Sequence, residues 1–202
     1  MSIEENYNRL CRTPLDISEH LPTLRFLASH CSTIVECGVR EAVSSYAFAH
    51  GLPADGTLIM VDPYKSHTID SFLQKEPRAS FVHDSDLTCP LIETDMLFID
   101  TWHVYGQLKR ELARWKDHVR KYIVMHDTEV DGIHGETIRM KYDAHAQSRE
   151  SGIPIEEILR GLQPALHEFL QSNPEWKIAT QYYNNNGLTV LMRIGEYPCL
   201  DL

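Results

Sequence analysis

A regular alternation of short apolar runs with segments of helical period most constrains the fold of this chain. The apolar runs have the length of β-strands, and most end at turn residues. They are Ser32–Cys37, Thr57–Asp62, Ala79–His83, Asp95–Asp100, Tyr122–His126, Trp176–Tyr183 and Leu188–Ile194. The helix-period segments are Leu15–Ser32, Glu41–Ala49, Ile69–Gln74, Val104–Val119 and Ile155–Gln171. Such alternation predicts a mostly parallel sheet with helices on both faces.

The last two apolar runs break the alternation, because only Asn184-Asn185-Asn186-Gly187 separates them. Asn and Gly tolerate positive φ, so this tetrapeptide predicts a hairpin turn. We therefore expect a doubly wound α/β fold whose seven-stranded sheet ends in an antiparallel hairpin. A single domain over residues 1–202 is expected, with a helical segment over residues 1–31 and a polar loop or lid over residues 132–151.

Composition and charge argue against several classes of protein. The chain has 202 residues, 43% of them hydrophobic, which is enough for one domain with a full core. Its net charge of -10 argues against nucleic acid as a partner, because binding phosphates needs a basic face. No apolar run approaches the ~20 residues of a membrane span, and no secretory signal begins the chain, so no membrane partner is expected. The cysteines form no C-x-x-C pair, which favours reduced thiols and a cytoplasmic location.

The turn after the first strand, in IVECGVREAVSSYAF, has one glycine where a dinucleotide site would need G-x-G-x-x-G. If Gly38 were the first glycine of this motif, Arg40 would stand in the place of the second. If Gly38 were the second, Glu36 would stand in the place of the first, and its carboxylate would lie beside the pyrophosphate. A carboxylate at this turn suits a cationic ligand instead, such as S-adenosylmethionine (SAM), which has a sulfonium, an ammonium group and no phosphate. Gly38 would let the ligand approach the backbone, and Ser44 or Ser45 could bind its carboxylate at the helix N-terminus.

Acids also follow the second and third strands. An acid that binds ribose hydroxyls is expected ~20 residues after the glycine of the first turn. Asp62 follows Gly38 at close to this spacing. Asp84 could accept a hydrogen bond from an adenine amino group. Either acid alone is also a common turn or cap residue, and Ser44 could simply cap a helix. The joint arrangement of Glu36, Gly38, Asp62 and Asp84 after three successive strands favours a cofactor site.

Groups that bind protons or metals end the fourth and fifth strands. Asp100 ends the fourth, with Trp102-His103 just beyond, and His126-Asp127 ends the fifth. Neighbouring parallel strands lie ~4.8 Å apart, so these ends can converge on one divalent ion, with Asp100 or His103 as the proton acceptor. Two other interpretations stay open. The site could be metal-free, with His103 as the base and Asp127 orienting it, or His126 could only donate to a backbone carbonyl.

The helix between these two strands has an apolar stripe that should be buried. The stripe consists of Val104, Leu108, Leu112, Trp115 and Val119. Lys109, Arg110 and Glu111 are expected on the solvated face of the same helix.

These features together resemble class I SAM-dependent methyltransferases, more narrowly the small-molecule O-methyltransferases grouped with macrocin-type and cephalosporin-hydroxylase-like proteins. The resemblance covers roughly Ser32 to Ile194 and is carried by VECGVREAVSS, LIMVDPY, DMLFIDTWHVYGQLKRELARW, YIVMHDT and GLTVLMRI. It implies a Rossmann-like methyltransferase fold. It also implies SAM as the cofactor, in a pocket formed by Glu36, Gly38, Asp62 and Asp84.

The same resemblance implies a divalent metal, Mg²⁺ or Mn²⁺, held by Asp100, His126 and Asp127. His126 departs from the acidic residue of the relatives, and Ala42 stands where many have a second glycine. The expected function is O-methylation of a small molecule or sugar. Two alternatives remain: a cofactor-binding accessory protein without turnover, and a metal-dependent hydrolase or hydroxylase. A homodimer is also compatible with the resemblance, because many such folds pair up.

Overall fold

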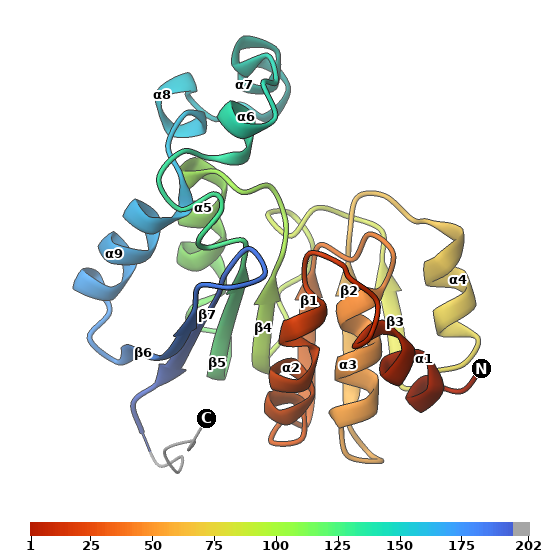
Figure 1. The fold of residues 1–202 in the computed structure, drawn as a ribbon. Helices are drawn as coiled ribbons and strands as arrows, with labels where there is room; N and C mark the ends of the chain where they lie inside the picture. The colour runs from red at the N-terminus through yellow and green to blue at the C-terminus, as the bar shows by residue number, and fades with distance from the viewer. Residues whose placement is uncertain (196–202) are drawn as a thin grey trace.

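A seven-stranded sheet runs through residues 1–195, the part of the chain that the computed structural model describes (Figure 1). The strands are β1 (Thr33–Cys37), β2 (Thr57–Val61), β3 (Ala79–Val82), β4 (Thr94–Ile99), β5 (Val119–His126), β6 (Trp176–Tyr182) and β7 (Leu188–Arg193). Their order across the sheet is β3-β2-β1-β4-β5-β7-β6. Strands β1 to β5 pair in parallel, and β7 pairs antiparallel with β5 and β6. The predicted fold, a doubly wound parallel sheet that ends in an antiparallel hairpin, is confirmed.

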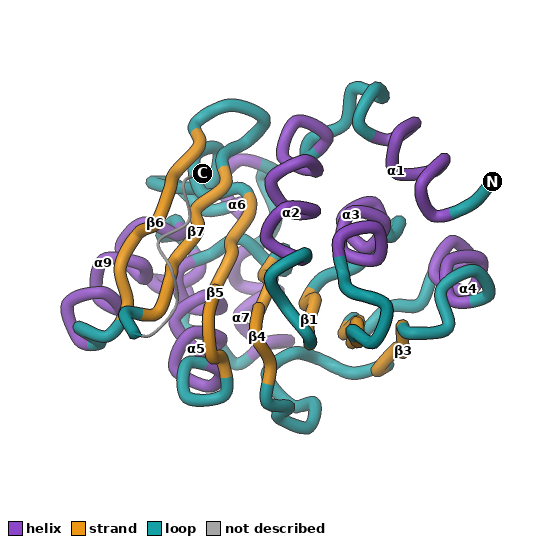
Figure 2. Tube along the Cα trace, turned by 90° about the horizontal axis from the view of Figure 1, so that it is seen from below, coloured by secondary structure: helices purple, strands orange, loops and turns teal. Residues whose placement is uncertain are grey.

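Helices cover both faces of the sheet (Figure 2). One face carries α1 (Ile3–Leu10), α2 (Leu21–Ala28), α3 (Val43–Gly51) and α4 (His67–Leu73), and the other carries α5 (Tyr105–Trp115) and α9 (Leu162–Ser172). Successive strand residues point to opposite faces, so Ile34 packs in the first core and Val35 in the second. None of the helices within residues 1–195 is both long and apolar enough to cross a membrane.

Two predicted helices are interrupted. The segment expected to form one helix from Leu15 to Ser32 contains a 3-10 turn, η1 (Ser18–His20), before α2. The helix expected over Ile155–Gln171 is divided into α8 (Ile155–Ile158) and α9. Gly161 separates the two and has no room for a side chain, because an added Cβ would lie 2.4 Å from the backbone oxygen of Asp131. This contact spans 30 residues of sequence, so the local pattern does not reveal it.

The segment predicted as a loop or lid, residues 132–151, contains two short helices, α6 (Glu136–Arg139) and α7 (Ala144–Ser151). Figure 1 shows α6, α7 and α8 as a group that projects beyond the sheet, above α5. The prediction for this helix was wrong in two places. Val119, expected on the helix, is the first residue of β5, because α5 ends at Trp115. Lys109 is exposed as expected, whereas Glu111 is buried, with only 1% of its surface exposed.

The ends of β1 and β4 approach each other closely at Gly38. This residue has a φ of +83°, and an added Cβ would lie 2.0 Å from the backbone oxygen of Asp100. The N–H of Gly38 donates to Val61 on β2, and the N–H of Asp100 donates to Cys37 on β1. Gly38 therefore turns the chain out of the sheet where no side chain fits. Ala42, further along the same loop, takes a φ of +59° with its methyl group buried, so this departure from the glycine of the relatives is accommodated.

We expect Gly38→Ala to lower the free energy of unfolding by about 3 kcal/mol or more, from the left-handed backbone and the collision with Asp100 together. The matched control is Gly152→Ala, because Gly152 has a φ of +72° with no atom within 4 Å of an added Cβ. Its loss should be only about 1 kcal/mol, the cost of the backbone conformation. Urea denaturation measures both losses, and equal losses would contradict the close approach.

Candidate functional site

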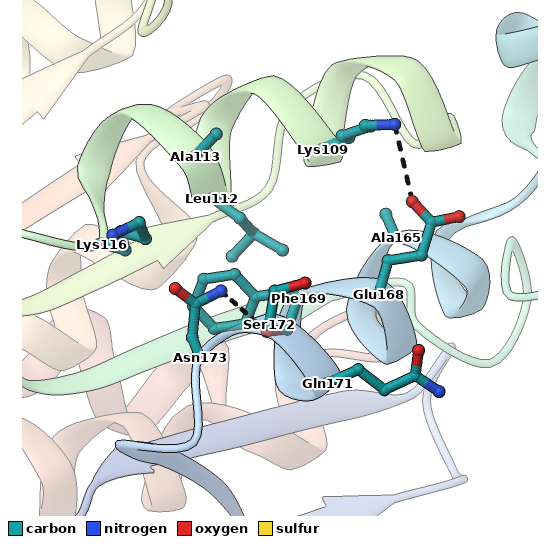
Figure 3. Close-up of a pocket in the computed structure, with 10 residues that line it drawn as sticks. All are labelled: Lys109, Leu112, Ala113, Lys116, Ala165, Glu168, Phe169, Gln171, Ser172 and Asn173. Carbon is teal, nitrogen blue, oxygen red and sulfur yellow. Dashed lines mark hydrogen bonds and ion pairs between the residues drawn. The ribbon is translucent and has the colours of Figure 1, made fainter.

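A cavity of 820 Å³ opens where the carboxyl ends of β1, β2, β3 and β4 meet. Its lining includes Gly38, Asp62, Ser85, Asp86, Asp100 and Gln107. Ligands of open α/β sheets bind in the crevice beyond these strand ends, and the volume suits a small molecule. A second hollow, of 450 Å³, lies between α5 and α9 (Figure 3). Its one acid, Glu168, is paired with Lys109, so this hollow has less chemistry to offer than the strand ends.

Asp62 holds the loop that follows β1. Its Oδ2 accepts hydrogen bonds from the N–H groups of Val39 (2.8 Å) and Arg40 (3.2 Å), and its Oδ1 accepts from the N–H of Tyr64 (2.8 Å). A carboxylate has about four positions that accept hydrogen bonds, so one remains on Oδ1. Because Asp62 also lines the cavity, this position is open to a hydroxyl of a ligand. The geometry is thus compatible with Asp62 both as a turn residue and as a ribose-binding acid.

Glu36 and Ser44 do not line the 820 Å³ cavity. The Glu36 side chain is fully buried, and its two oxygens accept hydrogen bonds from the hydroxyls of Ser44 and Ser45, the latter at 2.6 Å. Burial raises the pKa of Glu36 to about 8, although the two hydroxyl donors act in the opposite direction. Glu36 therefore fastens the start of α3 to the end of β1, and its carboxylate does not face a ligand in this cavity.

Asp84 stabilises the turn after β3. Its Oδ1 accepts from the N–H of Ser85 and from the hydroxyl of Thr88, each at 2.7 Å. Asp84 does not line the 820 Å³ cavity, whereas Ser85 and Asp86 do. Nothing in the sequence distinguishes Asp84 from Asp86 as the cavity acid, because both follow the third strand closely.

A smaller cavity of 320 Å³ adjoins the first. Arg40, Asp100 and Thr101 line both cavities, so they form a common wall. On the other side of this wall the smaller cavity is lined by the end of β5, at Asp127, and by α6, at Glu136. Ligands in the two cavities would therefore meet at Asp100.

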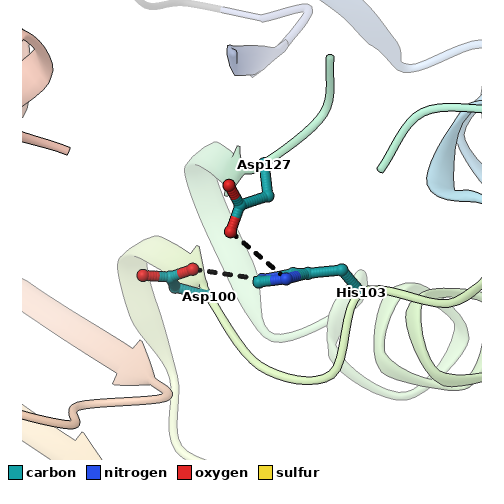
Figure 4. A group of neighbouring side chains, drawn as sticks. All are labelled: Asp100, His103 and Asp127. Atoms are coloured by element: carbon teal, nitrogen blue, oxygen red, sulfur yellow. Dashed lines mark hydrogen bonds and ion pairs between the residues drawn. The ribbon is translucent and has the colours of Figure 1, made fainter. Parts of the chain in front are cut away.

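His103 lies among carboxylates in this smaller cavity (Figure 4). Its Nε2 contacts Oδ1 of Asp100 at 3.2 Å, and its Nδ1 lies 3.2 Å from Oδ2 of Asp127. Asp131 and Glu136 follow at 3.4 and 3.7 Å from Nδ1. Burial lowers the pKa of His103, but the surrounding acids outweigh it and raise this pKa well above its usual value. Asp100 and Asp127 were predicted as site residues, whereas Asp131 and Glu136 were missed, because they come from the polar segment after β5.

His126 is oriented by the turn of the C-terminal hairpin. Its Nε2 lies 3.2 Å from the backbone oxygen of Asn185, to which it can only donate. Its Nδ1 therefore faces Oδ1 of Asp100 and Oδ2 of Asp127, at 3.4 and 3.5 Å. Burial lowers the pKa of His126, but these two carboxylates raise it to about 10. For Asp100, burial raises the pKa, but hydrogen bonds from His103 and His126 bring it well below its usual range.

The cluster has the features of a site for a divalent cation. Asp100, His103 and Asp127 each offer a ligand atom, and these atoms lie within 4.8 Å of one another. Oδ1 of Asp127 and Nδ1 of His103 are buried, and neither makes a hydrogen bond within residues 1–195. Buried polar atoms normally have partners, and an ion would supply one. This geometric set contains His103 where the sequence predicts His126, although His126 contacts the same two carboxylates.

Asp127 also has an unusual backbone, with a φ of +56°. Residues other than glycine adopt this conformation at a cost, and such residues are found frequently at functional sites. This backbone conformation lies at the end of β5, where Oδ2 of Asp127 is 3.2 Å from Nδ1 of His103.

Solved structures of methyltransferases share this fold over most of the chain. A candidate caffeoyl-CoA O-methyltransferase from Staphylococcus aureus has a TM-score of 0.64 at 15% sequence identity, with 96% of this chain and 92% of that chain covered. The O-methyltransferase TomG from Streptomyces achromogenes, in complex with SAM, has a TM-score of 0.60 at 18% identity, with 88% and 81% covered. An O-methyltransferase from Bacillus cereus, in complex with S-adenosylhomocysteine (SAH), has a TM-score of 0.59 at 14% identity, with 94% and 90% covered.

No protein-family model and no curated protein matches the sequence. At these low identities the structural likeness establishes the fold. The chain has the Rossmann-like fold of class I SAM-dependent methyltransferases, as the sequence resemblance predicts.

We expect the Glu36→Gln substitution to change stability in a pH-dependent way. Burial raises the pKa of Glu36 from 4.5, its ordinary value, to about 8 in the folded state. The wild type therefore loses stability as the pH rises from 4.5 towards 8, where the unfolded chain has already released this proton. The variant has no such loss, so it should match the wild type near pH 4 and exceed it by roughly 2–5 kcal/mol near pH 8. Chemical denaturation at both pH values measures the difference, and Glu41→Gln, on an exposed residue, is the control. A difference between Glu36→Gln and the wild type that stays constant with pH would refute the buried-acid account.

Proposed function

We propose that this protein is a SAM-dependent O-methyltransferase that binds the cofactor in the 820 Å³ cavity and a small hydroxyl compound in the 320 Å³ cavity. The observation that carries the proposal is the common wall of the two cavities, which contains Asp100. Methyl transfer requires the nucleophile and the methyl donor to be held close and in line. Two adjoining cavities that meet at an acid provide that arrangement.

The larger cavity suits SAM in its chemistry. When bound, SAM supplies a methyl group on a positively charged sulfur. Asp100, whose pKa is held low, is negatively charged when that cation binds. Asp62 has one free position for a ribose hydroxyl, and we assign Asp86, which lines the cavity, to accept from the adenine amino group. Gly38 leaves the cavity floor bare of a side chain, without the glycine series that a pyrophosphate would need.

The smaller cavity suits a polar acceptor, either a small molecule or a sugar. Its lining includes Asp16, Arg40, Glu136, Arg139 and Asn186, whose side chains can all form hydrogen bonds with a hydroxyl group. Glu136, Arg139 and Met140 come from α6 and the residue after it, so the 132–151 segment serves as a lid over this cavity. Oδ1 of Asp100, in contact with Nε2 of His103, is the atom that we assign to receive the proton of the reacting hydroxyl.

Asp100, His103 and Asp127 would hold a divalent cation, which would replace the proton on His103, and His126 would orient the two carboxylates. Such an ion would lower the pKa of a hydroxyl group that it binds. Two carboxylates with one imidazole suit Mg²⁺ or Mn²⁺, with the nitrogen ligand favouring Mn²⁺.

Calorimetry tests the cofactor part of the proposal. We expect SAM and SAH to bind the wild type and NAD⁺ not to bind, because the site has no pyrophosphate loop. The Asp62→Asn variant should bind SAH about tenfold more weakly, since it loses a charged acceptor. The control Asp55→Asn, on an exposed residue of the α3–β2 connection, should bind SAH like the wild type. Absence of SAM and SAH binding to folded wild-type protein would end the proposal.

The metal part is tested by Mn²⁺ binding, followed by electron paramagnetic resonance of the free ion. We expect Asp127→Asn to weaken Mn²⁺ binding at least tenfold, or about 1.4 kcal/mol, because a buried ligand loses its charge. Asp117→Asn removes an exposed carboxylate after α5 and should leave Mn²⁺ binding unchanged. Equal Mn²⁺ affinity in the wild type and Asp127→Asn would rule out this metal site. Cofactor binding that persists without metal binding, with function unaffected in Asp100→Asn, would instead favour the accessory protein without turnover.

A further inference from the structure

Two buried carboxyl groups lie together at the wall of the 820 Å³ cavity. Asp86 and Glu111 are 5% and 1% exposed. The side-chain amide of Gln107 bridges them: its Nε2 lies 2.9 Å from Oε1 of Glu111 and 3.3 and 3.4 Å from the two oxygens of Asp86. Asp86 and Gln107 line the cavity, whereas Glu111 lies behind them. Glu111 plays no part in the methyl-transfer scheme, so its burial has a different reason.

Neither carboxyl group has an ion pair within the part of the chain that the structure describes. Arg114 on α5 directs its Nε to the backbone oxygen of Asp86, at 3.2 Å, and its Nη2 to the backbone oxygen of Cys89. The thiols of Cys37 and Cys89 also face this region, and burial raises the pKa of both, so both are neutral. Two adjacent buried carboxylates without a counter-ion are very unfavourable, and such pairs hold a proton between them.

Glu111 is the member of the pair with a place for that proton. Its Oε1 accepts from the hydroxyl of Thr101 and from the amide of Gln107. Its Oε2 is buried and has no hydrogen-bond partner among residues 1–195. Burial, and next the charge of Asp86, raise the pKa of Glu111 well above its usual value.

We propose that Asp86 and Glu111 share one proton, carried by Glu111, and that Glu111 thereby holds Asp86 as a hydrogen-bond acceptor in the wall of the cofactor cavity. Glu111 is then a positioning residue that acts through Asp86. That SAH is the ligand of this cavity rests on the function proposed above, whereas the shared proton is independent of that function. Loss of the proton at high pH would put a second charge into the pair, where Gln107 has no further donor to offer. Asp86 would shift, and the cavity would bind SAH less well.

Infrared spectroscopy of the ligand-free protein tests the shared proton. A protonated carboxylic acid absorbs apart from a carboxylate, so the wild-type spectrum minus that of Glu111→Gln should contain the acid band at neutral pH. The difference removes the contribution of Glu36, which is present in both proteins. Glu150→Gln, on an exposed residue, is the control and should give no acid band in its difference spectrum. A Glu111→Gln difference spectrum with only carboxylate bands overturns the proposal.

Calorimetry with SAH tests the positioning role. As the pH rises from neutral to alkaline values, the wild type should lose about tenfold more affinity for SAH than Glu111→Gln, whose amide donates to Asp86 and does not titrate. Comparing the two proteins cancels the ionisation of the amino group of SAH. Parallel pH profiles would overturn the positioning role. If the wild type binds no SAH at any pH, the proposed function fails, and the infrared result still decides whether the proton is shared.

Discussion

The contact between the backbones of Gly38 and Asp100 is the constraint on which the rest of this structure depends. With no side chain at Gly38, the end of β1 lies against the end of β4, where an added Cβ would be 2.0 Å from the oxygen of Asp100. In the loop after β1, the N–H groups of Val39 and Arg40 can then donate to the carboxylate of Asp62, which follows β2. The same contact puts Asp100 in the wall that the two cavities share. The absence of a side chain at Gly38 thus shapes the 820 Å³ cavity and brings it next to the 320 Å³ cavity.

Carboxyl groups gather at this edge of the sheet, and each is stabilised by a different partner. Asp62 accepts hydrogen bonds from backbone amides, and Glu36 accepts them from two serine hydroxyls. Burial raises the pKa of Glu36 to about 8. The imidazoles of His103 and His126 compensate Asp100. Asp86 is left with a neutral neighbour in our account. A surplus of negative charge suits a cationic methyl donor and a divalent ion, and it disfavours a pyrophosphate.

The sequence predicts those parts of the molecule that depend on local pattern. The alternation of strands and helices predicts the sheet, and the turn Asn184-Asn185-Asn186-Gly187 predicts the hairpin. The last three residues of this turn all have positive φ. The sequence pattern does not reveal contacts between segments that lie far apart in the chain. Gly161, just before α9, packs on the backbone of Asp131, and the side chain of Asp131 lies 3.4 Å from Nδ1 of His103. Glu111 looks solvated in sequence because it is charged, although it lies three residues from Leu108 on the buried side of α5.

A crystal structure with SAH and Mn²⁺ would show whether the two cavities hold donor and metal on either side of Asp100. We expect SAH in the 820 Å³ cavity, with its ribose at Asp62 and its sulfur towards the wall that contains Asp100, and Mn²⁺ on the other side of that wall beside Asp127. SAH bound elsewhere on the protein, or a cavity that closes on its own side chains and excludes SAH, would contradict this expectation.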